Sequence, residues 1–337
     1  MAFESRQLLQ PPISRAAYSD RTAWLMAEMS RLAYEKFEGN PELLDAFADK
    51  LARTSDRSAI RRELSAMAEK WIAPGGPGQR RLTAQLAEAG FELVRTFNSA
   101  GTQAFLAKRD EDKVAVLAFR GTEADAKDIK TDLNARFYVR NGVKVHTGFR
   151  DAFEAVETEL KKAVGELRDH SLYVAGHSLG GALALIATRT LNCDNLAACY
   201  TYGSPKVGDQ EFGDAIKPPI YRIVNAADAV PRVPPGWPLE ILIVAAHFVP
   251  LPYLRDWLVR VLQGLRGYRH HGDMRYLSAC KEDFGDLRVV SNPDQFDRAV
   301  WLVKRVLGNY ATVFLDHRIA DYCAKLEHYA LGRIETK

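Results

Sequence analysis

The chain has 337 residues, of which 47% are hydrophobic and 26% are charged, and these values are ordinary for a globular protein. They exclude a disordered, collagen-like or coiled-coil protein. The formal net charge is +3, which is close to neutral for this length and gives no reason to expect nucleic-acid binding. The four cysteines form no Cys-x-x-Cys pair, so we expect reduced thiols and neither disulfides nor a zinc site.

The N-terminus has no features of a secretory signal peptide, because Glu4 and Arg6 precede any apolar run. A notable apolar stretch without charges, 241–254, holds 14 residues and two prolines. A membrane-spanning helix needs about 20 apolar residues. We therefore expect a soluble, cytoplasmic protein, and export by a signal-independent route stays open.

Residues 1–90 are predicted to be mostly helical. Asp20 can cap a helix whose apolar residues fall at helical spacing, and a second helical stretch covers 41–72 before a Pro/Gly-rich break. One or two helix pairs bury little apolar surface alone. We therefore expect this N-terminal helical segment to pack on the domain that follows.

Residues 91–337 are predicted to form an α/β domain with a mostly parallel central sheet flanked by helices. Short β-branched or aromatic runs alternate there with helical patterns, which is typical of this class. The expected strands are 91–97, 102–107, 114–119, 172–175, 199–202 and 221–224, and the expected helices are 149–167 and 181–190.

The most specific motif is Gly-His-Ser-Leu-Gly-Gly at 176–181. An apolar strand precedes it and an Ala/Leu-rich helix follows, and in this context Gly-x-Ser-x-Gly indicates a nucleophile elbow with Ser178 as the nucleophile. Glycines are needed at 176 and 180 because side chains there would collide across the turn. The backbone N–H of Leu179 is then expected to bind the oxyanion. The structural alternative is a glycine-rich turn without catalytic function.

An elbow serine needs a base and an orienting acid, which follow it in the chain of such enzymes. Asp228 comes directly after the predicted strand 221–224, at the edge where catalytic groups gather in such sheets. The alternative is a turn-forming aspartate. Among the eight histidines, position and order leave His270 and His317 as candidates for the base.

Five short segments occur in this order: Phe-Arg-Gly-Thr at 119–122, Val-His-Thr-Gly-Phe at 145–149, the elbow at 176–181, Thr-Tyr-Gly-Ser-Pro-Lys-Val-Gly at 201–208 and Asn-Ala-Ala-Asp-Ala-Val-Pro at 225–231. The series resembles the blocks of the class 3 lipases, the fungal triacylglycerol lipase family of the α/β-hydrolase fold. The resemblance covers about residues 91–330 and implies that fold.

The resemblance also implies a choice of base. In that family a Tyr-x-His-x-Gly block is not catalytic, and residues 268–272 resemble it. The family's base lies in a later Asp-His element with a tyrosine a few residues on, which residues 316–322 resemble. The resemblance therefore implies His317 as the base, with His270 as the alternative. It also implies Thr122 as the second oxyanion donor and a lid at about 123–130, although this stretch is too polar for an interfacially activated lid.

The insert 234–267 is rich in apolar residues. It could form a cap over an acyl-chain pocket, dock on a membrane surface, or pack against the N-terminal helices. The sequence leaves these three alternatives open.

The expected function is that of a serine carboxylic-ester hydrolase, a lipase or esterase that acts on acylglycerol, phospholipid or small esters through an acyl-enzyme. We expect no metal and no organic cofactor. The alternatives are a non-catalytic hydrolase-fold interaction protein and an acyltransferase or thioesterase with the same triad. Acyl-chain length and oligomeric state are left open by the sequence.

Overall fold

The computed structural model describes residues 3–9, 16–35, 76–121, 137–140, 142–233, 238–264, 266–294, 297 and 315–335. The predicted helical stretch 41–72, the candidate oxyanion residue Thr122 and the lid segment 123–130 lie outside these residues.

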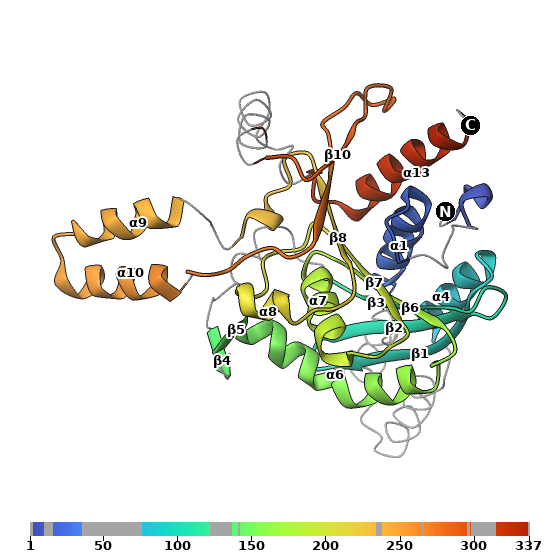
Figure 1. Ribbon diagram of the computed structural model, residues 1–337, viewed down its shortest axis with the longest axis horizontal. Helices are drawn as coiled ribbons and strands as arrows, with labels where there is room; N and C mark the ends of the chain where they lie inside the picture. Colours follow the sequence, from blue (N-terminus) through green and yellow to red (C-terminus); the bar gives the residue numbers. More distant parts are fainter. Residues whose placement is uncertain are drawn as a thin grey trace, which may run out of the picture.

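An eight-stranded sheet forms the centre of the molecule (Figure 1). The strands, in spatial order, are β1 (Glu92–Ser99), β2 (Thr102–Arg109), β3 (Val114–Phe119), β6 (Ser171–His177), β7 (Leu196–Tyr202), β8 (Ile220–Asn225), β9 (Asp273–Leu277) and β10 (Val289–Ser291). The run from β3 to β9 is parallel, whereas β1, β2 and β10 add antiparallel edges. A separate ribbon pairs β4 (Phe137–Arg140) with β5 (Val143–His146).

Helices cover both faces of this sheet, and the alternation of side chains along each strand explains why. Leu172 and Val174 of β6 face the cluster that contains α6 (Thr147–Gly165) and α7 (Leu179–Leu191). Tyr173 and Ala175 face the opposite cluster, which contains α1 (Asp20–Leu32), α4 (Pro77–Glu88) and α13 (Ile319–Glu335). A strand buried on both faces reads as one continuous apolar run, as β6 does. The described residues also form three short elements: η1 (Arg6–Leu8), α8 (Gln210–Asp214) and η2 (Val230–Arg232).

The predicted α/β-hydrolase fold is confirmed by this architecture, in which a strand, a sharp turn and a helix stand at the centre of a mostly parallel sheet. One local prediction is wrong. The N-cap of α1 is Ser19, whose side-chain oxygen accepts from the Thr22 backbone N–H at 3.5 Å, and Asp20 is the first helical residue. An acidic residue in the first turn still favours the helix through its dipole.

Helix α1 packs on the sheet and beside α13, so the first and last described helices lie side by side (Figure 1). Trp24 of α1 is fully buried in the shared core. The hydroxyl of Tyr202, the last residue of β7, donates to the backbone carbonyl of Ala23. This contact joins the N-terminal helix to the carboxyl edge of the sheet.

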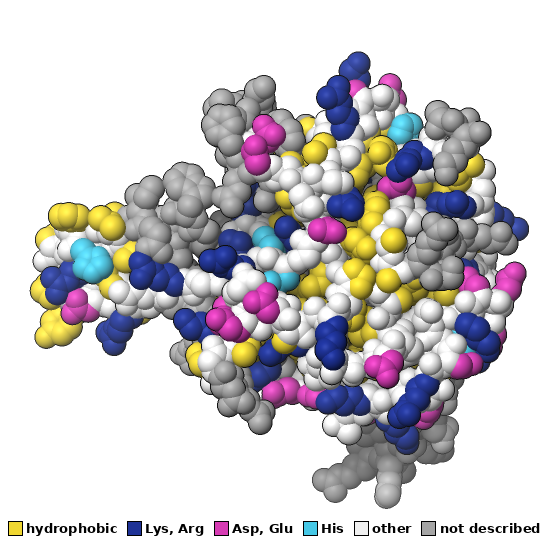
Figure 2. All heavy atoms as spheres, viewed as in Figure 1, with side chains coloured by type: hydrophobic (Ala, Val, Ile, Leu, Met, Phe, Trp, Pro, Cys, Tyr) yellow, Lys and Arg dark blue, Asp and Glu magenta, His cyan; other side chains and the backbone are white. Residues whose placement is uncertain are grey.

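Two helices of the apolar insert, α9 (Pro238–His247) and α10 (Pro252–Gly264), pack on each other as a hairpin. Figure 1 shows the hairpin projecting from the body, away from the sheet and from α1. In Figure 2 its outer part carries a concentration of hydrophobic side chains. None of the described helices is long and apolar enough to cross a lipid bilayer.

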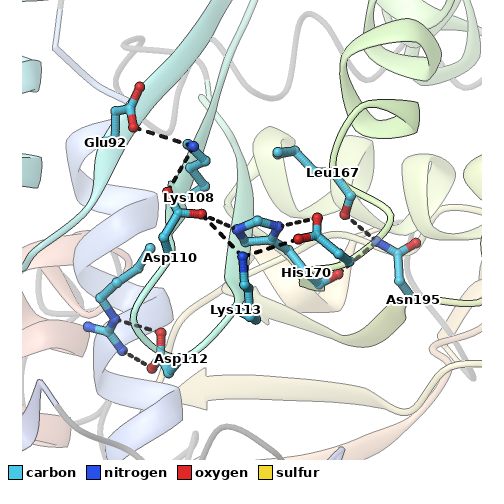
Figure 3. Close-up of polar contacts among 10 residues, drawn as sticks. Glu92, Lys108, Asp110, Asp112, Lys113, Leu167, His170 and Asn195 are labelled. Atoms are coloured by element: carbon cyan, nitrogen blue, oxygen red, sulfur yellow. Dashed lines mark hydrogen bonds and ion pairs between the residues drawn. The ribbon is translucent and has the colours of Figure 1, made fainter.

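A cluster of polar side chains lies at the start of β6, at the end of the strand opposite to Ser178 (Figure 3). His170 is 3% exposed, and its Nδ1 and Nε2 lie 2.8 and 2.9 Å from carboxylate oxygens of Asp169 and Asp110. The amine of Lys113 reaches both carboxylates, at 3.2 and 3.8 Å. The cluster thus joins the turn between β2 and β3 to the start of β6.

Candidate active site

Ser178 stands at the junction of β6 and α7 with backbone angles of φ 57° and ψ −128°. A non-glycine residue at positive φ is strained and needs surrounding structure to hold it there. Two contacts hold this turn: the Ser178 N–H donates to the carbonyl of Tyr202, and the Gly181 N–H donates to the carbonyl of Ser178. The serine therefore sits on a strained strand-to-helix turn, the geometry of a nucleophile elbow.

Two glycines make this turn sterically feasible. A Cβ at Gly176 would lie 2.1 Å from the carbonyl oxygen of Gly180, and a Cβ at Gly180 would lie 2.3 Å from that of Phe119. Both contacts are with backbone, which cannot rotate away as a flexible side chain can. The turn therefore closes only with glycine at both positions.

His317 and Asp228 meet Ser178 at this turn. The Nε2 of His317 lies 2.9 Å from Ser178 Oγ, and its Nδ1 lies 2.9 and 3.0 Å from the two carboxylate oxygens of Asp228. Since a carboxylate only accepts, Nδ1 carries the hydrogen and Nε2 is free to accept from the serine hydroxyl. Residues that lie 50 and 89 positions apart in the chain thus form one continuous hydrogen-bonded series.

Asp228 is fully buried and hydrogen-bonded on both oxygens. Oδ1 accepts from the backbone N–H of Val230 at 2.9 Å, and Oδ2 accepts from the hydroxyl of Tyr322 at 2.6 Å. Burial, and then the charge of Asp228, raise the pKa of Tyr322 well above its ordinary value, so that its hydroxyl stays a donor. A buried carboxylate held by several donors is an effective partner for a charged imidazole.

The segment that carries His317 is fastened to the segment that carries Asp228. Asp316 accepts from the Ala227 backbone N–H through its side chain at 3.0 Å, and from the Asn225 amide through its backbone carbonyl at 2.9 Å. The Nζ of Lys325 in α13 donates to the other end of the Asn225 side chain at 2.7 Å. His317 and Asp228 are therefore positioned as one unit.

His177, next to the nucleophile, is held by hydrogen bonds on both ring nitrogens. Its Nε2 donates to the backbone carbonyl of His317 at 2.6 Å, so its Nδ1 is the acceptor for the hydroxyl of Tyr34 at 2.8 Å. Complete burial, followed by the proximity of His317, lowers the pKa of His177 well below its ordinary value. The neutral ring of His177 therefore positions the backbone of His317. Tyr34, just past α1, holds the His177 ring in place.

The remaining predicted residues have the following places. Leu179 begins α7, where the first backbone N–H groups of a helix point outward without helical partners. His270 lies elsewhere, with its Nε2 at 2.5 Å from the carbonyl of Pro231, whereas it is His317 that contacts Ser178. Within the described ranges, no group of three or more His, Cys, Asp or Glu side chains could hold a metal ion.

Residues 116–237 match the family model described as Lipase (class 3). This part of the chain is similar to the class 3 lipases. The resemblance stated from the sequence motifs is thereby confirmed, and the class 3 lipase region contains Ser178 and Asp228 but ends before His317.

Two curated relatives give the extent of this similarity. A secreted mono- and diacylglycerol lipase of Fusarium solani is 33% identical over 147 residues, which cover 36% of this chain and 44% of that protein. A lipase of Rhizomucor miehei is 32% identical over 163 residues, which cover 43% of this chain and 45% of that protein. The chain thus spans less than half the length of these relatives.

A solved structure, lipase II from Rhizopus niveus, superposes with a TM-score of 0.45 at 25% identity, over 60% of this chain and 71% of that chain.

The sequence reasoning missed two contributors to the site. Tyr34 lies just past α1, 143 positions before its partner His177, and no motif marks it. Asp316 was noted only as part of the Asp-His element, and its bond to the Ala227 backbone could not be read from the sequence.

Proposed function

We propose that this protein is a serine carboxylic-ester hydrolase that acts on lipid esters, with Ser178 as nucleophile, His317 as base and Asp228 as the orienting acid. The observation that carries the proposal is the pair of contacts made by one imidazole ring, 2.9 Å to the serine hydroxyl and 2.9 Å to a buried carboxylate. Nucleophile, base and acid within hydrogen-bond reach are the requirement for covalent acyl transfer.

In the proposed first step, Ser178 Oγ attacks the ester carbonyl carbon while its proton moves to His317 Nε2. The Nδ1–H bond to Asp228 stabilises the resulting imidazolium. The Leu179 N–H, at the positive end of α7, donates to the oxyanion of the tetrahedral intermediate. The intermediate collapses to an acyl-serine, and the imidazolium returns its proton to the alcohol that leaves.

In the second step, a water molecule gives a proton to His317 and attacks the acyl-serine carbonyl. The second tetrahedral intermediate then collapses, the bond between the acyl carbon and Ser178 Oγ breaks, and the imidazolium returns its proton to Oγ as the carboxylic acid leaves. Every proton in this cycle moves through one nitrogen, Nε2, because Nδ1 stays hydrogen-bonded to Asp228.

The lipid part of the proposal rests on the relatives. The chain is similar to lipases, including one named as a mono- and diacylglycerol lipase, which supports acylglycerol esters as the substrate class. Hydrolysis rates for esters from C2 to C16, measured below and above the micellar threshold, test it. A rise in rate at the threshold supports a lipase, whereas a smooth decline beyond C4 contradicts it in favour of a soluble esterase.

The catalytic assignment is tested with a fluorophosphonate probe and with p-nitrophenyl butyrate. We expect the probe to modify Ser178, identified by mass spectrometry of the labelled peptide. Ser178→Ala and His317→Ala should each lower kcat/KM by at least about 10³-fold. Ser291→Ala, on an exposed strand end, and His270→Ala serve as controls. Turnover retained in folded Ser178→Ala would reject the nucleophile, and full loss in His270→Ala alone would reject the base.

A further inference from the structure

The α9–α10 hairpin exposes an unusual number of large hydrophobic side chains. Ile243 and Ala246 of α9 are buried, whereas many of the other hairpin side chains whose burial is described are exposed. In the described chain, eight large hydrophobic residues are exposed, and six of them belong to this hairpin: Val244, Phe248, Leu251, Tyr253, Leu254 and Trp257. A concentration of this kind marks an interaction surface, whereas single exposed hydrophobics do not.

The most exposed of these side chains gather where the two helices meet. Phe248 is 81% exposed and Tyr253 is 93% exposed, on either side of the turn between α9 and α10. Trp257 follows one turn later and is 54% exposed. Tyrosine and tryptophan prefer the boundary between hydrocarbon and water, where their rings are covered and their polar atoms stay hydrated.

Arginines follow this apolar tip along α10. Arg255 is paired with Asp256 at 2.9 Å, and Arg260 is exposed one further turn along the helix. Arg266 and Arg269 continue the series beyond α10, so that residues 238–269 hold four arginines against two carboxylates. In Figure 2, Lys and Arg side chains border the hydrophobic ones on this projection. The hairpin therefore has an apolar end, and the basic side chains Arg260, Arg266 and Arg269 lie toward and just beyond the other end of α10.

The spacing of these two parts fits a lipid surface. Arg260 follows Tyr253 by seven residues, which is about 10 Å along a helix axis. An interfacial helix inserts its apolar side chains about 5–10 Å into the boundary between headgroups and acyl chains. With the hairpin entering tip first to that depth, the guanidinium of Arg260 would lie near the level of the phosphates, which attract basic residues when the lipid is anionic. A groove in a partner protein, or a second copy of this chain, would not require aromatic side chains at the tip followed by basic side chains farther along the helix.

We infer that the α9–α10 hairpin docks the protein on membranes that contain anionic phospholipids, with Phe248, Tyr253 and Trp257 inserted and the arginines against the phosphates. This inference deepens the proposed function, since it states where the hydrolase meets its lipid. Its test measures binding and not hydrolysis, so that the two can fail separately.

The experiment is vesicle co-sedimentation of the full chain with the Ser178→Ala substitution, which leaves the lipid intact. Vesicles of phosphatidylcholine alone are compared with vesicles that contain 30% phosphatidylglycerol. We expect the protein to bind the anionic vesicles about tenfold or more tightly. The variant Phe248→Ser/Tyr253→Ser/Trp257→Ser should lose at least about tenfold of this binding. The variant Arg260→Gln/Arg266→Gln should lose the preference for anionic lipid.

Val139→Ser is the matched control, because Val139 is 55% exposed on β4 and lies outside the hairpin. Thermal melting of each variant checks that it is folded. Equal binding by the triple variant and the control, or equal binding to both kinds of vesicle, would overturn the inference. Sedimentation velocity tests the alternative that a second copy of the chain covers this surface. One outcome would favour that alternative: the protein with the unsubstituted hairpin forms dimers, the triple variant is monomeric, and neither protein binds vesicles. In that case the surface joins two copies and the inference is wrong.

Discussion

The hydroxyl of Tyr322 donates to Asp228 Oδ2 at 2.6 Å, on the same oxygen that receives the Nδ1–H of His317 at 2.9 Å. The same tyrosine oxygen accepts the backbone N–H of Asn225 at 3.0 Å. Tyr322 therefore connects α13 to the end of β8 and holds the carboxylate of Asp228 that contacts the proposed base, His317. Two predictions concern residues of this kind, which position the triad without touching substrate.

Replacing Tyr322 by phenylalanine should lower kcat with little change in KM. A hydrogen bond to a charged group is worth about 1.5–3 kcal/mol, so we expect a loss of about 10- to 100-fold in kcat on a short p-nitrophenyl ester. Tyr329→Phe, a half-buried tyrosine on the same helix, is the control. A kcat within about twofold of the unsubstituted protein would show that Tyr322 does not position Asp228.

Replacing Tyr34 by phenylalanine should destabilise the protein, because it leaves Nδ1 of the buried His177 without its donor. An unsatisfied buried polar group costs about 1–3 kcal/mol, measurable as a lower free energy of unfolding in urea. Tyr253→Phe removes an exposed hydroxyl and should leave this free energy unchanged. Equal stabilities of the two variants would contradict the positioning of His177 by Tyr34.

The two glycine positions Gly176 and Gly332 should respond to alanine in opposite ways. Gly176→Ala would bring a Cβ to 2.1 Å from a backbone oxygen, and we expect little soluble, folded protein. Gly332 lies inside α13 with open space at its Cβ position, so Gly332→Ala should stabilise the fold by about 0.5–1 kcal/mol. Expression yield and melting temperature measure both. A normally folded Gly176→Ala protein would mean that the elbow can open.

The cluster around His170 should make stability depend on acid pH. Hydrogen bonds from Lys108 and His170 lower the pKa of Asp110, and those from His170 and Lys113 lower the pKa of Asp169. A carboxyl whose pKa is lowered by folding stabilises the protein above its ordinary pKa of 3.8, and this stabilisation is lost as pH falls below that value.

The test compares melting temperatures between pH 7 and pH 3. The melting temperature of the Asp110→Asn protein should fall less between pH 7 and pH 3 than that of the unsubstituted protein, because the contribution of the Asp110 carboxyl is absent. The same should hold for Asp169→Asn. Glu159→Gln, an exposed residue on α6, is the control. Identical acid dependence in all four proteins would show that the cluster contributes nothing.

The sequence predicted the centre of this fold well and its edges less completely. Strand 114–119 was predicted at its observed bounds, because a run of apolar residues buried on both faces leaves no ambiguity. Strands β9 and β10 were not predicted, since β9 mixes charged and apolar residues and is stabilised mainly by pairing with β8. Tertiary pairing of this kind leaves little local pattern.

For the candidate site, local patterns were informative and distant contacts were not. The elbow around Ser178 follows from its glycines, because a strained turn limits the residues that fit. The choice between His270 and His317 depended on family resemblance, since both histidines follow the serine and the acid. Tyr34 could not be found, because its contact with His177 depends on how α1 packs beside α13.

The order of the triad along the chain has a consequence for synthesis. Ser178 and Asp228 leave the ribosome well before His317, which is 139 positions after the serine and lies just ahead of α13. A nascent polypeptide therefore carries the proposed nucleophile without its proposed base until the segment that holds His317 is made and α13 packs beside α1. The proposed hydrolase thus gains its base only once residues 315–335 have been made and α13 has packed beside α1.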